Sequence, residues 1–120
     1  FLVLGVLFFL SSISFIFDSE PKQYINTYDT QFIVNCSSNS MGLTIGCNDI
    51  VYADEFDGNI VKGDIYAYKN SNQRIVVHRI VGCIDKRCDQ VIFKGDGNIF
   101  IELVNRTMIT HKIKGVEYNE

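Results

Sequence analysis

The first 17 residues constrain this chain more than any other feature, because none of them carries a charge. They read FLVLGVLFFLSSISFIF, and 13 of the 17 are apolar. As an α-helix this segment would be about 26 Å long, close to the roughly 30 Å hydrocarbon core of a bilayer. A removable signal peptide would need a small-residue cleavage site after it, and none follows. We therefore expect residues 1–17 to be a transmembrane anchor that continues upstream, with a cleaved signal or a buried helix as the alternatives.

Residues 18–120 have the composition of one β-rich domain. They contain 14 Ile and 9 Val but only two Ala and two Leu, which favours strands over helices. Short apolar runs alternate with turn-forming residues, and we expect strands at 31–35, 49–53, 64–69, 74–83, 90–93 and 108–116. The predicted fold is mainly β: a small coiled antiparallel sheet or barrel preceded by the transmembrane helix.

The four cysteines form two pairs that are close in sequence. Ten residues separate Cys36 from Cys47, and four separate Cys83 from Cys88. This spacing suits two local disulfides, the second closing a hairpin, on the oxidising side of a membrane. A zinc site and free buried thiols are the alternatives, although neither pair has the C-x2-C spacing typical of zinc. We therefore expect the domain on the extracytoplasmic or luminal side.

The net charge and the distribution of basic residues limit the classes of partner that this chain can bind. The net charge is −3 and the chain has no run of basic residues, which argues against nucleic acid. We assign no cofactor and no metal ion.

Three short motifs carry groups that can do chemistry. Ser40-Met41 lies in a serine- and glycine-rich stretch, His78-Arg79 lies within a predicted strand, and Asp96 follows Lys94-Gly95 after another strand. Each motif alone is typical of an ordinary turn or strand. The other histidine, His111, is expected at the surface.

Together the motifs resemble a known family. Their order behind an apolar N-terminal segment is similar to that of the type I signal peptidases, in the archaeal and endoplasmic-reticulum branch, which has His where the bacterial branch has Lys. The resemblance rests on Ser40-Met41, Gly63-Asp64, His78-Arg79, Lys94-Gly95-Asp96 and a closing strand at 113–116.

The resemblance implies a role for several residues of this chain. Ser40 matches the nucleophile, His78 the general base, Asp96 an essential acidic residue, and Ser38 the side-chain donor to the oxyanion. We expect Asp96 to approach the side of the imidazole opposite Ser40. Glu102 lies near a second acidic position of the family, so whether Asp96 or Glu102 orients the ring stays open. Candidates for shallow substrate pockets are Met41, Ile45 and Val77.

The expected function is a membrane-bound serine endopeptidase that removes signal peptides from secretory preproteins. Its partners would be those signal peptides and the lipid membrane. A repressor-type autopeptidase that shares the fold is one alternative, although the anchor and the histidine base argue against it. A non-catalytic, disulfide-stapled binding domain tethered to the membrane is the other. The contact between Ser40 and His78 discriminates these interpretations, because catalysis requires hydrogen-bond reach, about 2.6–3.2 Å.

Overall fold

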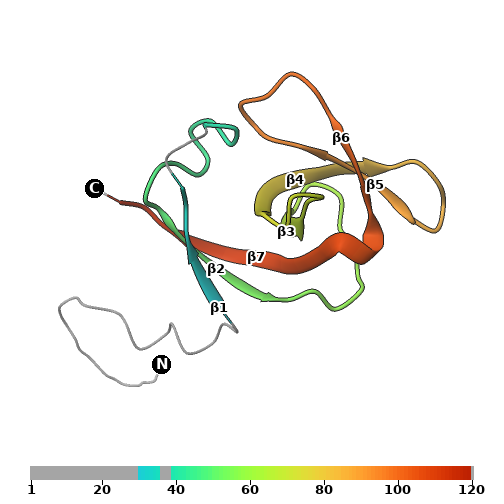
Figure 1. Cartoon of the computed structure of the whole chain (residues 1–120), viewed down its shortest axis with the longest axis horizontal. Coiled ribbons are helices and arrows are strands. Elements are labelled where there is room, and N and C mark those ends of the chain that lie inside the picture. Colours follow the sequence, from blue (N-terminus) through green and yellow to red (C-terminus); the bar gives the residue numbers. More distant parts are fainter. Residues whose placement is uncertain (1–29, 36–38, 120) are drawn as a thin grey trace, which may run out of the picture.

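The computed structural model describes residues 30–35 and 39–119, and these form one antiparallel β-sheet (Figure 1). In chain order the strands are β1 (Thr30–Ile33), β2 (Ile50–Glu55), β3 (Ile65–Lys69), β4 (Ile75–Cys83), β5 (Gln90–Lys94), β6 (Glu102–Asn105) and β7 (Ile109–Glu117). A single turn of 3₁₀-helix, η2 (Arg106–Met108), connects β6 to β7. The prediction of a mainly β domain is therefore confirmed.

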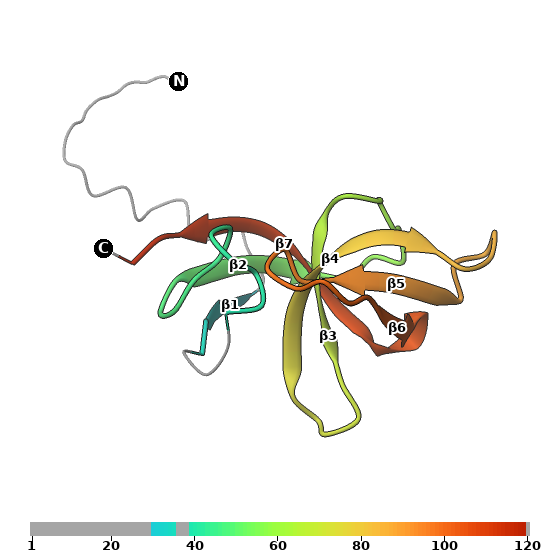
Figure 2. The same cartoon turned by 90° about the horizontal axis from the view of Figure 1, so that it is seen from above.

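The strands are ordered β1-β2-β7-β3-β4-β5-β6, so β1 and β6 are the edge strands. β7 lies inside the sheet, where residues 111–117 pair with β2 on one edge of the strand and residues 109–112 pair with β3 on the other. Viewed from above, β1, β2 and the end of β7 lie to one side, and β4, β5 and β6 lie to the other (Figure 2). The sheet therefore coils into two connected halves.

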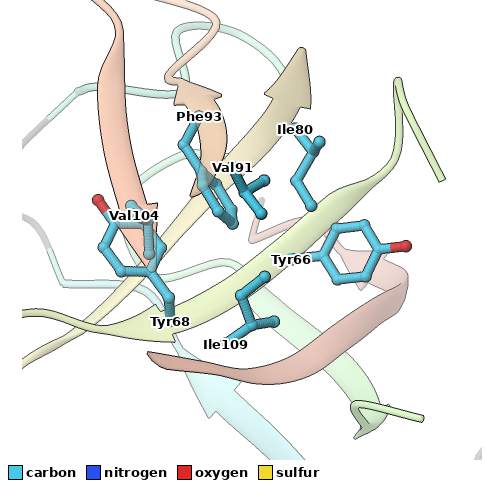
Figure 3. Close-up of a cluster of buried hydrophobic side chains, with 7 residues drawn as sticks. All are labelled: Tyr66, Tyr68, Ile80, Val91, Phe93, Val104 and Ile109. Atoms are coloured by element: carbon cyan, nitrogen blue, oxygen red, sulfur yellow. The ribbon is translucent and has the colours of Figure 1, made fainter. Parts of the chain in front are cut away.

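Each half has its own hydrophobic core, which follows from the alternation of buried and exposed residues along the strands. The larger cluster lies under β3 to β7 and is shown in Figure 3: Tyr66, Tyr68, Ile80, Val91, Phe93, Val104 and Ile109. The smaller cluster contains Met41, Ile45 and Val51 and fixes the loop between β1 and β2. Residues 39–49 are thus held against the sheet by apolar packing, although they are neither helix nor strand.

Six of the seven strands lie where the sequence predicts them, with shifts of one or two residues at their ends. β6 was not predicted, because it has only four residues and buries one of them, Val104. Its position is set by pairing with β5, from Gln90↔Asn105 to Phe93↔Glu102. Residues 1–17, the predicted membrane anchor, lie outside the described residues. Within the described part of the chain, no helix has the length and apolar character needed to cross a bilayer.

Candidate active site

Ser40 lies in a tight turn that the smaller core holds in place. The amide of Gly42 donates to the carbonyl of Asn39 at 3.0 Å, and Gly42 has a φ of +60°, which glycine tolerates without strain. The next residue after the serine, Met41, is buried. Because Met41 anchors the turn in the core, the Ser40 side chain is presented beside the sheet rather than within the core.

His78 lies in the middle of β4 with only 3% of its surface exposed. Its Nε2 is 2.9 Å from Ser40 Oγ, although the two residues are 38 positions apart in sequence. The predicted contact between the serine and the histidine is therefore present. This is the geometry needed for an imidazole to take a proton from a hydroxyl.

The other ring nitrogen of His78 bonds to Glu102, the first residue of β6. The distance from Nδ1 to Oε1 is 2.8 Å. An ionised carboxylate only accepts hydrogen bonds, so this contact places the proton of the neutral ring on Nδ1. Nε2 then carries the free electron pair, and Ser40 Oγ donates its hydrogen to it. The result is a continuous chain of hydrogen bonds, Ser40–His78–Glu102, which we call the Ser–His–Glu chain.

The expected contact between Asp96 and the imidazole was wrong. The Asp96 carboxylate accepts from Arg79 Nε at 2.9 Å, from Arg79 Nη2 at 2.7 Å and from Thr44 Oγ1 at 2.6 Å. The reason is the alternation along β4: His78 and Arg79 are adjacent, so their side chains leave opposite faces of the sheet. Asp96 lies on the face of Arg79, and Glu102 lies on the face of His78.

Asp96 instead ties together the segments that surround Ser40. The Arg79 guanidinium, followed by the Thr44 hydroxyl, holds the pKa of the Asp96 carboxyl well below its usual range, at about 2. Burial opposes this shift but does not cancel it. Arg79 also donates from Nη1 to the carbonyl of Gly63 at 2.7 Å. The ionised Asp96 therefore joins the loop that bears Ser40 to β4 and to the turn before β3.

The turn at residues 95–98 packs directly against the turn that carries Ser40. The amide of Gly97 donates to the carbonyl of Ser40 at 2.7 Å. A Cβ placed on Gly97 would lie 2.8 Å from the carbonyl oxygen of Asn39, and one on Gly95 would lie 2.3 Å from that of Ser40. Both glycines are thus required by close approach of backbone to backbone. This contact accounts for the two glycines of the Gly-Asp-Gly sequence that follows β5.

A groove of about 530 Å³ adjoins Ser40 and is lined mostly by apolar side chains. The three residues predicted to line substrate pockets, Met41, Ile45 and Val77, all line it. Its walls come from β1 and from the first half of β4, and Phe32 and Val76 are representative residues of the two walls. β1 is an edge strand, and β5 pairs with β4 only from Arg79 onward. Two strand edges therefore face the groove.

The remaining site predictions have mixed outcomes. Cys83 and Cys88 form the predicted disulfide, with a Cα–Cα distance of 5.0 Å, and Cys47 is also disulfide-bonded. These three sulfurs are therefore neither free thiols nor zinc ligands. Cys36 and Ser38 lie outside the described residues. His111 is partly buried rather than exposed, with its ring 5.3 Å from that of Phe32 in an edge-to-face contact.

Two members of the site were not assigned from the sequence. Glu102 was left as an alternative to Asp96, and Tyr68, whose hydroxyl donates to Glu102 Oε1 at 2.6 Å, was not singled out at all. The only sequence signal for Tyr68 was a polar aromatic residue in a buried strand, where the hydroxyl needs a partner.

Comparison of the chain with models of known protein families found no match, and a search of curated proteins found none either.

Proposed function

We propose that this chain is a membrane-bound serine endopeptidase of the signal peptidase type, which removes signal peptides from secretory preproteins. The observation that carries the proposal is the 2.9 Å contact between Ser40 Oγ and His78 Nε2, with Glu102 on the opposite ring nitrogen. The resemblance of the sequence motifs to the type I signal peptidases supports the substrate class. The apolar segment 1–17 supports action at a membrane.

The Ser–His–Glu chain has the groups for acyl transfer in two stages. As Ser40 Oγ attacks the scissile carbonyl carbon, its proton passes to His78 Nε2, and Glu102 stabilises the resulting imidazolium. The tetrahedral intermediate then expels the amine, which takes the proton from Nε2 and leaves an acyl-enzyme. Water attacks the acyl carbon and gives a proton to His78 Nε2. The bond between that carbon and Ser40 Oγ then breaks, the proton passes from Nε2 to Oγ, and the second product leaves as a carboxylic acid.

The oxyanion of the tetrahedral intermediate needs hydrogen-bond donors in this scheme. The backbone amide of Ser40 and the hydroxyl of Ser38 are the candidates, the latter by resemblance. A single donor of this kind contributes about 3–4 kcal/mol to transition-state stabilisation in serine proteases.

The groove beside Ser40 suits an extended peptide. Strand edges of β1 and β4 border it, and a peptide added to such an edge gains main-chain hydrogen bonds in a defined register. Alternate side chains of that peptide would enter the apolar groove near Met41, Ile45 and Val77. Shallow pockets of this kind favour the small residues next to the scissile bond that signal peptides carry. Disulfides within the domain support an extracytoplasmic or luminal location.

Preprotein cleavage by the full chain in lipid vesicles tests the proposal. We expect turnover by the wild-type chain and a loss of at least about 10⁴-fold in Ser40→Ala and in His78→Ala. Glu102→Gln should lose about 10²–10⁴-fold, because the amide no longer stabilises the imidazolium. Ser71→Ala, in the exposed turn between β3 and β4, and His111→Ala are the matched controls and should stay within about threefold of wild type.

The outcomes of this assay separate the candidate functions. Preprotein cleavage that depends on Ser40 supports the peptidase. Cleavage confined to the chain itself supports the autopeptidase. Preprotein that binds without cleavage supports the binding domain. Cleavage that survives His78→Ala but is lost in His111→Ala overturns the assignment of the base.

A further inference from the structure

Tyr68 extends the Ser–His–Glu chain by one buried group. It lies on β3 with 6% of its surface exposed, and its ring packs against Phe93 at a centroid distance of 4.7 Å. Figure 3 shows it within the larger hydrophobic cluster. Its hydroxyl donates to Glu102 Oε1 at 2.6 Å, and its ring centroid is 6.5 Å from that of His78. Rigid packing therefore fixes the position from which this hydroxyl reaches Glu102.

The phenol remains a hydrogen-bond donor at every pH at which a protein of this kind works. Burial of the ring, followed by the hydrogen bond and the negative charge of Glu102, raises the pKa of Tyr68 far above its usual value of 10. A phenol that stays protonated has one hydrogen to donate, and here that hydrogen is directed at a carboxylate.

Glu102, in contrast, has little else to hold it. It is the first residue of β6, an edge strand of four residues that pairs with β5 alone among the described strands. Its side chain is 37% exposed, so water competes for the carboxylate. The residues just before it, Ile99, Phe100 and Ile101, are exposed as well. A glutamate in this setting has several rotamers available, and the observed one brings Oε1 to His78 Nδ1.

Both hydrogen bonds end on the same oxygen. Oε1 of Glu102 accepts from Tyr68 at 2.6 Å and contacts Nδ1 of His78 at 2.8 Å. Hydrogen bonds from two donors on two different strands fix the position of this oxygen, whereas a single hydrogen bond would leave it free to move around its donor. We propose that Tyr68 is a positioning residue: its hydroxyl holds Glu102 in the rotamer that keeps the His78 proton on Nδ1 and leaves Nε2 free to accept from Ser40. The consequence for catalysis rests on the proposed function, whereas the consequence for the imidazole tautomer does not.

The test compares Tyr68→Phe with Tyr66→Phe in the full chain. Tyr66 is the matched control, because it is buried two residues away on β3 and its hydroxyl also makes hydrogen bonds, to the Val61 amide and the Asn59 carbonyl. We expect Tyr68→Phe to lower kcat about 10- to 100-fold with KM within twofold. Tyr66→Phe should stay within threefold on both constants. A kcat for Tyr68→Phe equal to that of Tyr66→Phe would overturn the proposal.

A double-mutant cycle shows whether Tyr68 acts through Glu102. In a Glu102→Gln background, Tyr68→Phe should cause no further loss of kcat, because the carboxylate that it positions is gone. If Tyr68→Phe lowers kcat by the same factor in the Glu102→Gln background as in the wild type, its effect is a general one on packing, and the proposed role is contradicted.

The third readout does not depend on activity. In chain labelled with ¹⁵N-histidine, NMR should find His78 of the wild type as the Nδ1–H tautomer, and Tyr68→Phe should convert it to a mixture of tautomers. The positioning role fails if the tautomer is unchanged. If the tautomer changes as expected but wild-type chain cleaves no preprotein, the proposed function fails while the positioning role stands. If Tyr68→Phe does not fold, the wild-type hydroxyl proton itself is sought, and an absent nuclear Overhauser contact from it to the Glu102 side chain overturns the proposal.

Discussion

Adding one methyl group at Gly95 should separate Ser40 from His78. Gly95 is buried at the end of β5, and a Cβ placed on it would lie 2.3 Å from the carbonyl oxygen of Ser40. The same Cβ would lie 3.0 Å from His78 Nε2 and 3.0 Å from Asn98 Nδ2. Gly95→Ala therefore inserts an atom against both members of the proposed catalytic pair.

The size of the required movement follows from these distances. Ordinary van der Waals contact for a Cβ begins near 3.4 Å, so the Ser40 carbonyl must retreat by about 1 Å. It is a backbone group in a tight turn, so it cannot swing aside as a flexible side chain would. The contact between Ser40 Oγ and His78 Nε2 is 2.9 Å, and a further 1 Å takes it beyond hydrogen-bond range. A misplacement of about 1 Å can cost about 10²-fold in rate, and overpacking destabilises a core by about 1–3 kcal/mol.

We therefore expect Gly95→Ala to lower kcat/KM for preprotein cleavage about 100-fold and the free energy of unfolding in urea by about 1–3 kcal/mol. The control is Gly82→Ala on β4, where a Cβ would have only an ordinary contact, 3.7 Å from Ile92 Cδ1. It should change both quantities little. Gly95→Ala with kcat/KM within threefold of wild type, in a chain that Ser40→Ala inactivates, would refute the proposed packing of the two turns.

Two further predictions concern stability. Because the folded state lowers the pKa of Asp96 from 3.8 to about 2, its ion pair with Arg79 stabilises the protein above about pH 4, and this contribution disappears as the pH falls toward 2. Partial exposure of the carboxylate limits this contribution to about 1 kcal/mol. Urea unfolding should therefore find a lower free energy of unfolding for Asp96→Asn than for wild type at pH 5, and a much smaller difference near pH 2. A difference that does not depend on pH would contradict the assignment. Replacing both Cys83 and Cys88 by serine should lower the free energy of unfolding by about 2 kcal/mol, since the loop closed is short. Cleavage at 25 °C should survive, because about 16 Å of strand separates this disulfide from His78, and its loss would show that the hairpin end contributes to the site.

The β character of the chain was readable from local sequence. Ile- and Val-rich runs between turn residues identified six strands, because strand preference and turn chemistry are properties of a few neighbouring residues. The Cys83–Cys88 disulfide was predictable for the same reason, as five positions along a hairpin bring two cysteines together. Ser40 and His78 were assigned because Ser40-Met41 and His78-Arg79 resemble motifs of a known family, and not because any local signal indicates that they meet.

What the sequence left open depends on where distant backbone segments lie. Asp96 and Glu102 are both acidic residues after β5, and nothing in their own neighbourhoods says which one reaches the imidazole. Tertiary structure decided it: the turn at residues 95–98 directs Asp96 to Arg79, and pairing of β6 with β5 brings Glu102 to the face of His78. β6 itself has four residues, of which one is buried, so its own sequence does not predict that it pairs with β5. The role proposed for Tyr68 arises in the same way, because one oxygen can be held between β3 and β4 only after the sheet has brought those strands and β6 together.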